Sequence, residues 1–425
     1  MSKPLLLSWK FAPLFCCQFF SAFNDNFLKT ALVFVILFGP DGHNALITLA
    51  SAIFIAPYFF LSGLGGEIAD RYDKAKVAQR LKLAEIAVAG IAVAGFMTDT
   101  LVLLFVALAL FGVISALFGP IKYGILPDHL AHEQLPAGNA LVEGATFIAI
   151  LGGTIAGGLA SKGGGTAVYV VLVVSFALLC WLSSLFIPPT GSGAPTLRIS
   201  PNIAASTIAM LRYLRTDPRL WWGALVTSWF WTAGIVVLAL LPVLVKHLVG
   251  GDEDTVTAYL AIFSVAVGAG SALAAMIARG RIVLRTTLVG AVLLALFALD
   301  LGVVLLGATP EPSLRRPNEV FSSLQGWMVA LDLAGLAVSG GLFIVPAFAA
   351  VQAWAGAAYR ARTVAAVNVL NAAFMTGATV LVALLQKAGL GVPQLFLLIG
   401  AIGLGVALAV WRTMPRDVSA ISSAS

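Results

Sequence analysis

Long apolar segments recur along the whole chain and constrain its fold more than any other feature of the sequence. Many of them exceed 18 residues, the length at which an apolar helix crosses a bilayer core about 30 Å thick. Of the 425 residues, 60% are apolar and only 10% are charged, so a soluble fold would lack the polar side chains to cover its surface. The sequence therefore predicts an all-α membrane protein.

Glycine, proline and charged residues divide the apolar sequence into about twelve predicted spans. Their approximate boundaries are 11–38, 46–66, 81–98, 101–126, 137–160, 166–188, 219–247, 255–278, 283–307, 326–352, 362–386 and 391–412. A stretch rich in Pro, Gly and Ser, followed by a short amphipathic segment, separates the sixth span from the seventh. We therefore expect an N-terminal six-helix bundle (1–188), a cytoplasmic linker with a short amphipathic helix (189–218) and a C-terminal six-helix bundle (219–425).

Basic residues are distributed unequally between the two sides of these spans. If the N-terminus is cytoplasmic, most Lys and Arg residues of the loops and tails fall on the cytoplasmic side, including Lys3 and Arg416. The opposite side receives only Lys162, Lys246, Arg315, Arg316 and Lys387. Because positive charge is retained on the cytoplasmic side of membrane proteins, the sequence predicts a multi-pass protein with both termini in the cytoplasm.

The loop between the second and third predicted spans carries a motif. It reads GLGGEIADRYDKAKVAQR over residues 63–80. This segment resembles the motif of the major facilitator superfamily at this place, which has a glycine, an Asp-Arg pair and several basic residues. The resemblance predicts a gating role for Gly66, Asp70, Arg71 and Lys74, in which a close helix contact and charges form in one conformation and separate in the other. An ordinary cytoplasmic loop rich in basic residues is the alternative.

The two halves of the chain echo each other weakly. SALFGPIKYGILP in span 4 parallels SGGLFIVPAFAAVQ in span 10, and GNALVEGATF in span 5 parallels AVNVLNAAFM in span 11. Two six-helix repeats around a linker are typical of major facilitator transporters, whose substrate site lies between the halves near the midplane. We therefore expect a twelve-transmembrane-helix major facilitator fold with two pseudo-symmetric halves. A carrier or channel of another architecture is the alternative.

Four polar residues interrupt the first predicted span. Asn24, Asp25, Asn26 and Lys29 lie in an otherwise apolar run, and Asp25 falls about 21 Å along it, close to the bilayer centre. A charge at this depth is costly unless it faces a cavity or a partner. Asp25 and Lys29 are four residues apart, so they can partly neutralise each other. The group is either an ion pair that joins the span to a neighbour or a substrate or gating site; we favour the second, because packing needs fewer polar groups.

The cytoplasmic end of span 4 contains a second candidate. Pro120 interrupts the helical hydrogen bonds there, so we expect the helix to bend or unwind beside Lys122 and Tyr123. A lysine ammonium at such a break would suit an anionic headgroup. Extension of the Lys122 side chain to the membrane surface is the alternative.

Span 5 and the later spans add further polar candidates. Asn139 and Glu143 share one face of span 5, and Asn368 occupies the matching place in span 11. Glu143 is either a binding or proton-handling acid or the partner of a nearby basic residue. Asp300 and Asp332 read as isolated acids, and Asp332 is close enough to its span end to be interfacial.

The sequence lacks the motifs of several other functions. It contains no Walker A motif, no metal-binding cluster and no acyltransferase motif, so we expect no enzymatic activity, cofactor or metal. Cys16, Cys17 and Cys180 lie inside spans without redox or metal spacing and are expected to be inert. The net charge of +6 follows from the topology, and no basic run joined to aromatic residues indicates nucleic acid.

Five segments from span 1 to span 10 form an ordered set, namely FSAFNDNFLKTALV, FGPIKYGIL, NALVEGATFIAILGGTIAGG, WFWTAGI and GGLFIVPAFAAVQ. Together they resemble the lysophospholipid transporter family of the major facilitator superfamily, and the first also resembles the transporter half of transporter–acyltransferase fusions. The resemblance implies a flippase of the bacterial inner membrane that moves lysophosphatidylethanolamine and lysophosphatidylglycerol from the outer to the inner leaflet. Its implied partners are these lipids, the membrane and a separate cytoplasmic acyltransferase. It further implies that Asp25, Asn26, Lys122 and Glu143 carry the polar site.

One segment departs from the family pattern. Members of the family carry a basic residue within span 7, whereas WTAGIVVLALLPVLVK has no charge before Lys246. Either Lys29 or Lys122 then binds the anionic part of the headgroup, or the substrate differs from a standard lysophospholipid. The alternative function is a major facilitator carrier of another amphipathic solute, such as a siderophore or drug, coupled to protons through Asp25 or Glu143.

Overall fold

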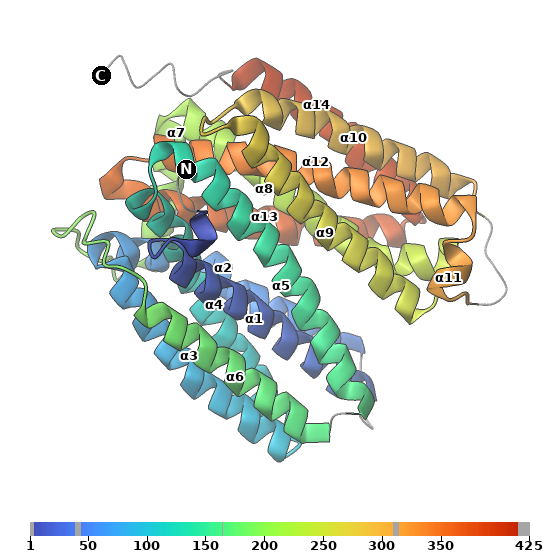
Figure 1. The fold of residues 1–425 in the computed structure, drawn as a ribbon, viewed down its shortest axis with the longest axis horizontal. Coiled ribbons are helices and arrows are strands. Elements are labelled where there is room, and N and C mark those ends of the chain that lie inside the picture. The colour runs from blue at the N-terminus through green and yellow to red at the C-terminus, as the bar shows by residue number, and fades with distance from the viewer. Residues whose placement is uncertain (1–3, 39–43, 164, 309–313, 415–425) are drawn as a thin grey trace. The chain divides into compact units, whose positions relative to one another are not determined.

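The computed structural model describes residues 4–38, 44–163, 165–308 and 314–414, so Lys3 and Arg416 of the predicted topology lie outside it. Within these ranges the structure is helical, and extended pairing is confined to a single bridge between Gly251 and Arg315 (Figure 1). The chain divides into two compact units. The first contains Met1–Gly138, Ile148–Pro218 and Gln352–Ala372; the second contains Asn139–Phe147, Arg219–Val351 and Ala373–Ser425. Each unit takes segments from both sides of the linker, and the predicted six-plus-six division stays a prediction.

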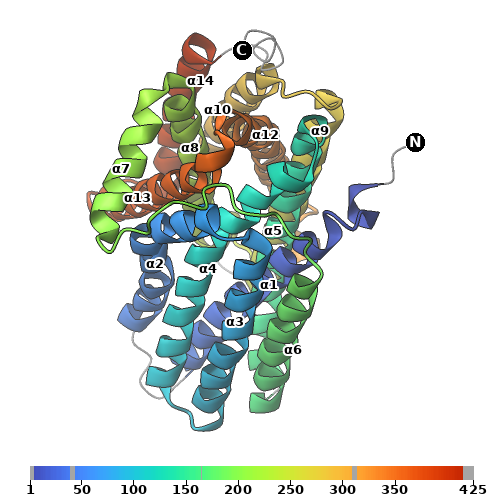
Figure 2. The ribbon, with the colours of Figure 1, turned by 90° about the vertical axis from the view of Figure 1, so that its left-hand side faces the viewer.

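Most helices of the N-terminal half belong to the first unit. They are α1 (Ala12–Phe38), α2 (Asn44–Arg71), α3 (Lys74–Met97), α4 (Leu101–His129), α6 (Gly165–Leu185) and α7 (Ile203–Thr216). Within this unit α3 packs against both α4 and α6, and α1 packs against α4 and α6 (Figure 2). The helix α5 (Leu135–Gly163) is shared between the units, and so is α13 (Arg360–Lys387), whose first part belongs to the first unit.

The second unit contains most of the remaining helices. They are α8 (Pro218–Leu244), α9 (Glu253–Ala278), α10 (Leu284–Leu306), the short α11 (Pro317–Val320), α12 (Leu324–Trp354) and α14 (Val392–Thr413). A π-helical turn, Val245–Val249, follows α8 directly, and α10 packs along α14.

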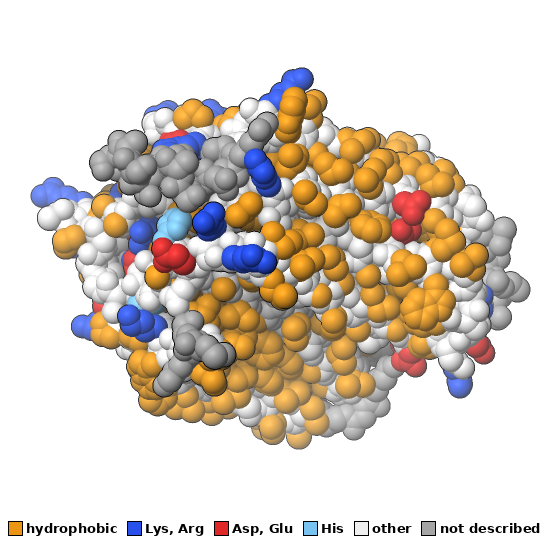
Figure 3. Space-filling view, turned by 45° about the horizontal axis from the view of Figure 1, so that its top comes forward, with side chains coloured by type: hydrophobic (Ala, Val, Ile, Leu, Met, Phe, Trp, Pro, Cys, Tyr) orange, Lys and Arg blue, Asp and Glu red, His pale blue; other side chains and the backbone are white. Residues whose placement is uncertain are grey.

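Eleven helices of the described chain are long and apolar enough to cross a membrane. Large apolar side chains on them remain exposed, as Met276 (72%) and Leu331 (63%) illustrate, and hydrophobic side chains cover much of the face in Figure 3. Such surfaces suit contact with lipid rather than water. The prediction of an all-helical, multi-pass membrane protein is therefore confirmed.

The helix α3 differs from its predicted span. It begins at Lys74 rather than near residue 81, because the Asp73 carboxylate accepts hydrogen bonds from the backbone N–H groups of Ala75 and Lys76 and caps the helix there. This early start places Lys82, the second residue of the predicted span, in the third turn of the helix.

The helix α4 also differs from expectation. It runs without interruption from Leu101 to His129 and includes both Pro120 and Pro127, so it does not unwind at Pro120, and a bend there stays a prediction. Proline is tolerated within membrane helices because neighbouring helices can satisfy the freed backbone groups.

The linker between the two predicted bundles is attached to the first unit by side-chain contacts. The backbone N–H groups of Thr190 and Gly191 donate to Oδ2 of Asp73 at 3.1 and 2.8 Å. Further along, Glu67 on α2 accepts a hydrogen bond from the hydroxyl of Ser206 on α7. The linker and α7 therefore follow α2 and the start of α3.

Glycines allow α1 and α5 to approach each other closely. A Cβ atom at Gly153 would overlap the carbonyl oxygen of Phe23, and one at Gly157 would lie 2.9 Å from Cβ of Thr30. The small-xxx-small spacing of these glycines therefore places two backbones in direct contact, as in other membrane helix pairs.

We predict that Gly153→Ala lowers the stability of the protein by about 1–3 kcal/mol, because the added methyl group meets backbone atoms that cannot move aside. The measurement is the thermal unfolding midpoint in detergent. Gly90→Ala on α3 is the matched control, since no atom lies within 4 Å of its added Cβ. An equal midpoint for the two variants would contradict the close contact of α1 and α5.

Candidate functional site

Asp25 lies in the middle of α1 within a buried polar cluster of the first unit. It is 6% exposed, and its Oδ2 accepts a 2.6 Å hydrogen bond from Oγ of Ser115 on α4. The hydroxyl of Tyr58 on α2 hydrogen-bonds the same serine. The other carboxylate oxygen, Oδ1, has no hydrogen-bond partner among the described residues. Three helices thus meet at a carboxylate that retains one unused acceptor.

Lys29 bonds to Asn26 rather than to Asp25. Its Nζ donates to Oδ1 of Asn26 at 3.1 Å and lies 6.0 Å from the ring centre of Phe54. The described chain shows no ion pair between Asp25 and Lys29, although the two charges interact through space. The partial neutralisation expected from their spacing therefore operates without a direct contact.

A buried ion pair on α3 was not anticipated from the sequence. Nζ of Lys82 lies 2.6 Å from Oε2 of Glu85 and donates a second 2.6 Å hydrogen bond to Oγ of Ser21, and both charged side chains are fully buried. The ammonium also lies 4.3 Å from the ring centre of Phe118. The available signal was two opposite charges three residues apart on one helix face, which indicates a local pair.

The predicted gating residues lie where α2 meets α13. Asp70 is fully buried and accepts hydrogen bonds from the backbone N–H groups of Ala361 (2.9 Å) and Arg362 (3.1 Å) and from Nε of Arg362 (2.9 Å). The carboxylate therefore caps the N-terminus of α13, where the helix dipole favours negative charge. One turn earlier, a Cβ on Gly66 would lie 2.6 Å from Cβ of Ala365, so the two helices touch.

A second ionic contact joins three helices beside the first. Oδ2 of Asp128, at the end of α4, lies 2.8 Å from Nζ of Lys74, and Oδ1 lies 2.6 Å from Nη1 of Arg360. Lys74 is almost fully buried, whereas the Arg71 guanidinium lies over the ring of Tyr72 at 5.2 Å. Gly66 and Asp70 thus contact α13, and Lys74 binds Asp128, which contacts α13. The gating role of these residues stays a prediction.

The candidates near Pro120 remain on a continuous helix. The ammonium of Lys122 lies 4.7 Å from the ring centre of Tyr123, and Tyr123 is buried. A Cβ on Gly119 would lie 3.0 Å from the amide nitrogen of Asn368, which places this part of α13 against α4.

The other candidates belong to the second unit. Asn139 and Glu143 are 0% and 1% exposed on the shared helix α5. Asp332 on α12 is 4% exposed, and its carboxyl interacts with that of Asp300 on α10. The two acids are therefore a pair, and the expectation that each is isolated is wrong. The sequence does not show which faces of α10 and α12 point toward each other.

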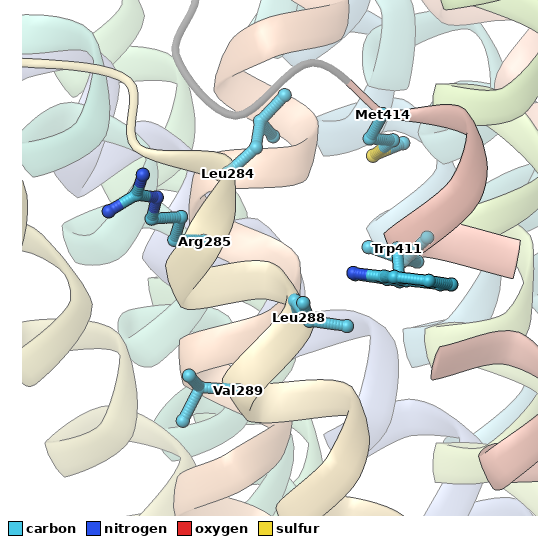
Figure 4. A pocket seen from close by; sticks show the side chains of 7 residues that line it. Leu284, Arg285, Leu288, Val289, Trp411 and Met414 are labelled. Carbon is cyan, nitrogen blue, oxygen red and sulfur yellow. The ribbon is translucent and has the colours of Figure 1, made fainter. Parts of the chain in front are cut away.

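A pocket of about 310 Å³ lies between α10 and α14 (Figure 4). It is lined by Leu284, Arg285, Leu288, Val289, Val410, Trp411 and Met414. One basic side chain among apolar ones gives it little capacity for a polar headgroup, and none of the candidate residues lines it.

The sequence matches the family model of the Major Facilitator Superfamily over residues 14–315. The chain belongs to this superfamily. Solved structures agree with the fold. The human organic anion transporter MFSD10 aligns with a TM-score of 0.74 and 14% identity, covering 95% of this chain and 99% of that protein. The transporter FucP aligns with a TM-score of 0.72 and 12% identity, covering 94% and 97%. The predicted major facilitator fold is confirmed.

Curated relatives of this major facilitator include the lysophospholipid transporter LplT of Yersinia pestis and of Yersinia pseudotuberculosis. Each is 33% identical over 280 residues, and the match spans 64% of this chain and 65% of the relative. Both relatives are transporters by name, and the match covers just under two thirds of their length.

We predict that Asp70→Asn loosens the contact between α2 and α13. The substitution removes the charge that Arg362 and the α13 N-terminus share, at a cost of about 1.5–3 kcal/mol for a buried, charged hydrogen-bond acceptor. A cysteine at the fully buried position Ala361, in a chain whose own cysteines are replaced by Ala, should then react several-fold faster with a water-soluble maleimide.

Asp99→Asn is the matched control, because Asp99 is exposed in the turn before α4. Unchanged labelling in Asp70→Asn, or equal labelling in both variants, would remove Asp70 from the contact that closes this end of the first unit.

Proposed function

We propose that this major facilitator moves lysophospholipids, with lysophosphatidylethanolamine and lysophosphatidylglycerol as its substrates, from the outer to the inner leaflet of the bacterial inner membrane by alternating access. Two lines of evidence support the proposal. The first is the 33% identity to lysophospholipid transporters over 64% of the chain. The second is the chemistry of the polar cluster on α1.

The observation that carries the proposal is the Asp25 carboxylate. It is buried near the centre of a membrane helix, yet Oδ1 has no hydrogen-bond partner among the described residues. A buried carboxylate oxygen without a donor is costly, and a positively charged ligand removes that cost. The ammonium of a phosphoethanolamine headgroup has the required charge. In this proposal Asp25 meets the ammonium, while Asn26, Lys29, Lys122, Tyr123 and Asn368 of the same unit complete the polar site. Asn139 and Glu143 remain separate candidates of the second unit.

The surroundings of this cluster are consistent with a single-chain lipid. Such a cargo needs a few polar contacts for the head and apolar walls for the tail. In the first unit the rings of Phe54 and Phe118 lie 6.0 and 4.3 Å from the ammonium groups of Lys29 and Lys82. Apolar and charged groups therefore adjoin each other at the proposed headgroup site.

The contacts of Asp70 and Asp128 supply a gate in this proposal. Both carboxylates bind the first residues of α13, and both lie at helix ends that the charge distribution assigns to the cytoplasm. Breaking these contacts would separate α13 from α2 and α4 and open the cytoplasmic side. Both termini would be cytoplasmic, and a separate cytoplasmic acyltransferase would consume the product.

One observation favours a second candidate. From Trp231 to Val245 the chain contains no charged residue, whereas the lysophospholipid transporter family is expected to carry a basic residue here. A carrier of another amphipathic solute, such as a siderophore or drug, would not need that charge. Protection of cells against toxic amphipathic compounds, without uptake of lysophospholipid, would favour this candidate.

We predict that Asp25→Asn lowers the uptake of lysophosphatidylethanolamine at least about tenfold, because the amide lacks the charge that binds the ammonium, a loss of ~1.4 kcal/mol or more. Spheroplasts with and without the protein are given the labelled lipid, and its conversion to phosphatidylethanolamine is followed. Membrane abundance and the unfolding midpoint are measured alongside. Uptake at the wild-type level in a normally abundant variant would remove Asp25 from the site.

We predict that Lys122→Ala weakens the uptake of lysophosphatidylglycerol more than that of lysophosphatidylethanolamine, by about fivefold, because the lost ammonium attracts the net negative headgroup. The same spheroplast assay compares the two labelled lipids. Lys76→Ala is the control, since that lysine is exposed on α3. A change in protein abundance alone would assign Lys122 to the membrane surface.

A further inference from the structure

The buried ion pair on α3 is not among the residues proposed to bind the headgroup. Lys82 and Glu85 are both 0% exposed, and Oε1 of Glu85 has no hydrogen-bond partner among the described residues. Burying two charges costs more than apolar packing of the same volume would, so such a pair is weak evidence for stability alone. Its position relative to Asp25 suggests what it does.

Two neighbouring helices fix that position. On α1, Ser21 accepts the hydrogen bond of Lys82 and lies one helical turn before Asp25. On α4, Ser115 donates to Asp25 and lies one turn before Phe118, whose ring faces the Lys82 ammonium. Residues three and four apart are neighbours on a helix surface, at about 5–6 Å between Cβ atoms. Both helices therefore place the ammonium about one turn from the Asp25 carboxylate.

At this distance Lys82 is able to neutralise Asp25. The two charges interact electrostatically, and a lysine side chain has four rotatable carbon bonds with which to cover one turn. Two other lysines also act on Asp25: Lys29, which is hydrogen-bonded to Asn26, and Lys122, which lies over the Tyr123 ring. The ammonium of Lys82 is instead bound to Glu85 and Ser21.

We propose that Glu85 is a positioning residue that keeps Lys82 from pairing with Asp25 and so leaves a carboxylate oxygen for the ammonium of a zwitterionic cargo. This inference rests on the proposed function and specifies how the headgroup is selected. Without the Glu85 charge, Lys82 moves to Asp25, the ammonium of the cargo loses its partner, and the cluster becomes more favourable to an anionic headgroup.

The test is Glu85→Gln, which keeps the shape of the side chain and removes its charge. We expect uptake of lysophosphatidylethanolamine to fall about tenfold, through a higher KM, while uptake of lysophosphatidylglycerol changes by less than about twofold. The neutral double variant Lys82→Met/Glu85→Gln should recover most of the lost uptake, because no ammonium is left to occupy Asp25. Glu133→Gln, an exposed residue outside the cluster, is the matched control.

Several outcomes would overturn the proposal. Equal loss for both lipids would indicate a structural pair, and so would a double variant that transports no better than Glu85→Gln. If Glu85→Gln does not fold, the double variant decides alone. The proposal requires Lys82→Met/Glu85→Gln to retain uptake of lysophosphatidylethanolamine, and this uptake must depend on Asp25.

A measurement without substrate separates this proposal from the proposed function. Unfolding midpoints of Lys82→Met, Asp25→Asn and their combination give the coupling between the two residues, first in the wild-type background and then in Glu85→Gln. We expect near-additive shifts in the wild type and a non-additive term of about 3 °C in Glu85→Gln, where the two charges pair. Equal coupling in both backgrounds overturns the positioning role. A wild-type protein that moves no lysophospholipid, with the expected change in coupling, overturns only the proposed function.

Discussion

The structure depends on the cost of placing charge in a membrane helix. A buried ion needs a partner, and in the first unit the partners come from the same helix and from neighbouring helices. Asp25 is held by Ser115 of α4, and Lys82 is held by Glu85 of its own helix and Ser21 of α1. These hydrogen bonds join α1 to both α3 and α4.

The same constraint acts differently at the ends of the helices. Asp70 binds backbone N–H groups and Arg362 at the start of α13, and Asp128 binds Arg360 there and Lys74 of α3. In the proposed gate these contacts break and reform, whereas both side chains of the Lys82–Glu85 pair are fully buried. In this proposal the unit combines a buried charge pair in its interior with reversible charge contacts at one end.

The sequence predicted the elements well, because apolar length and glycine spacing act locally. Eleven helices of the described chain are long and apolar enough to cross a membrane, against about twelve predicted spans, and the close helix contact predicted at Gly66 is present. The errors arose where a neighbouring helix decides the outcome. α4 continues through Pro120, and Lys82 is buried because Glu85 and Ser21 receive its ammonium. The rotation of each helix about its axis decides which partner a polar side chain meets. This rotation cannot be read from a single sequence.

The tethering of the linker has a consequence for how the polypeptide can be altered. Asp73 binds Thr190 and Glu67 binds Ser206, the two ends of this segment. Its path is therefore set by local bonds and not by the distance it spans. Insertion of several residues between Thr190 and Ser206 would form a surface bulge and leave the hydrogen bonds at both ends intact. The segment is bonded to the first unit at both ends, and its length can change without loss of this attachment.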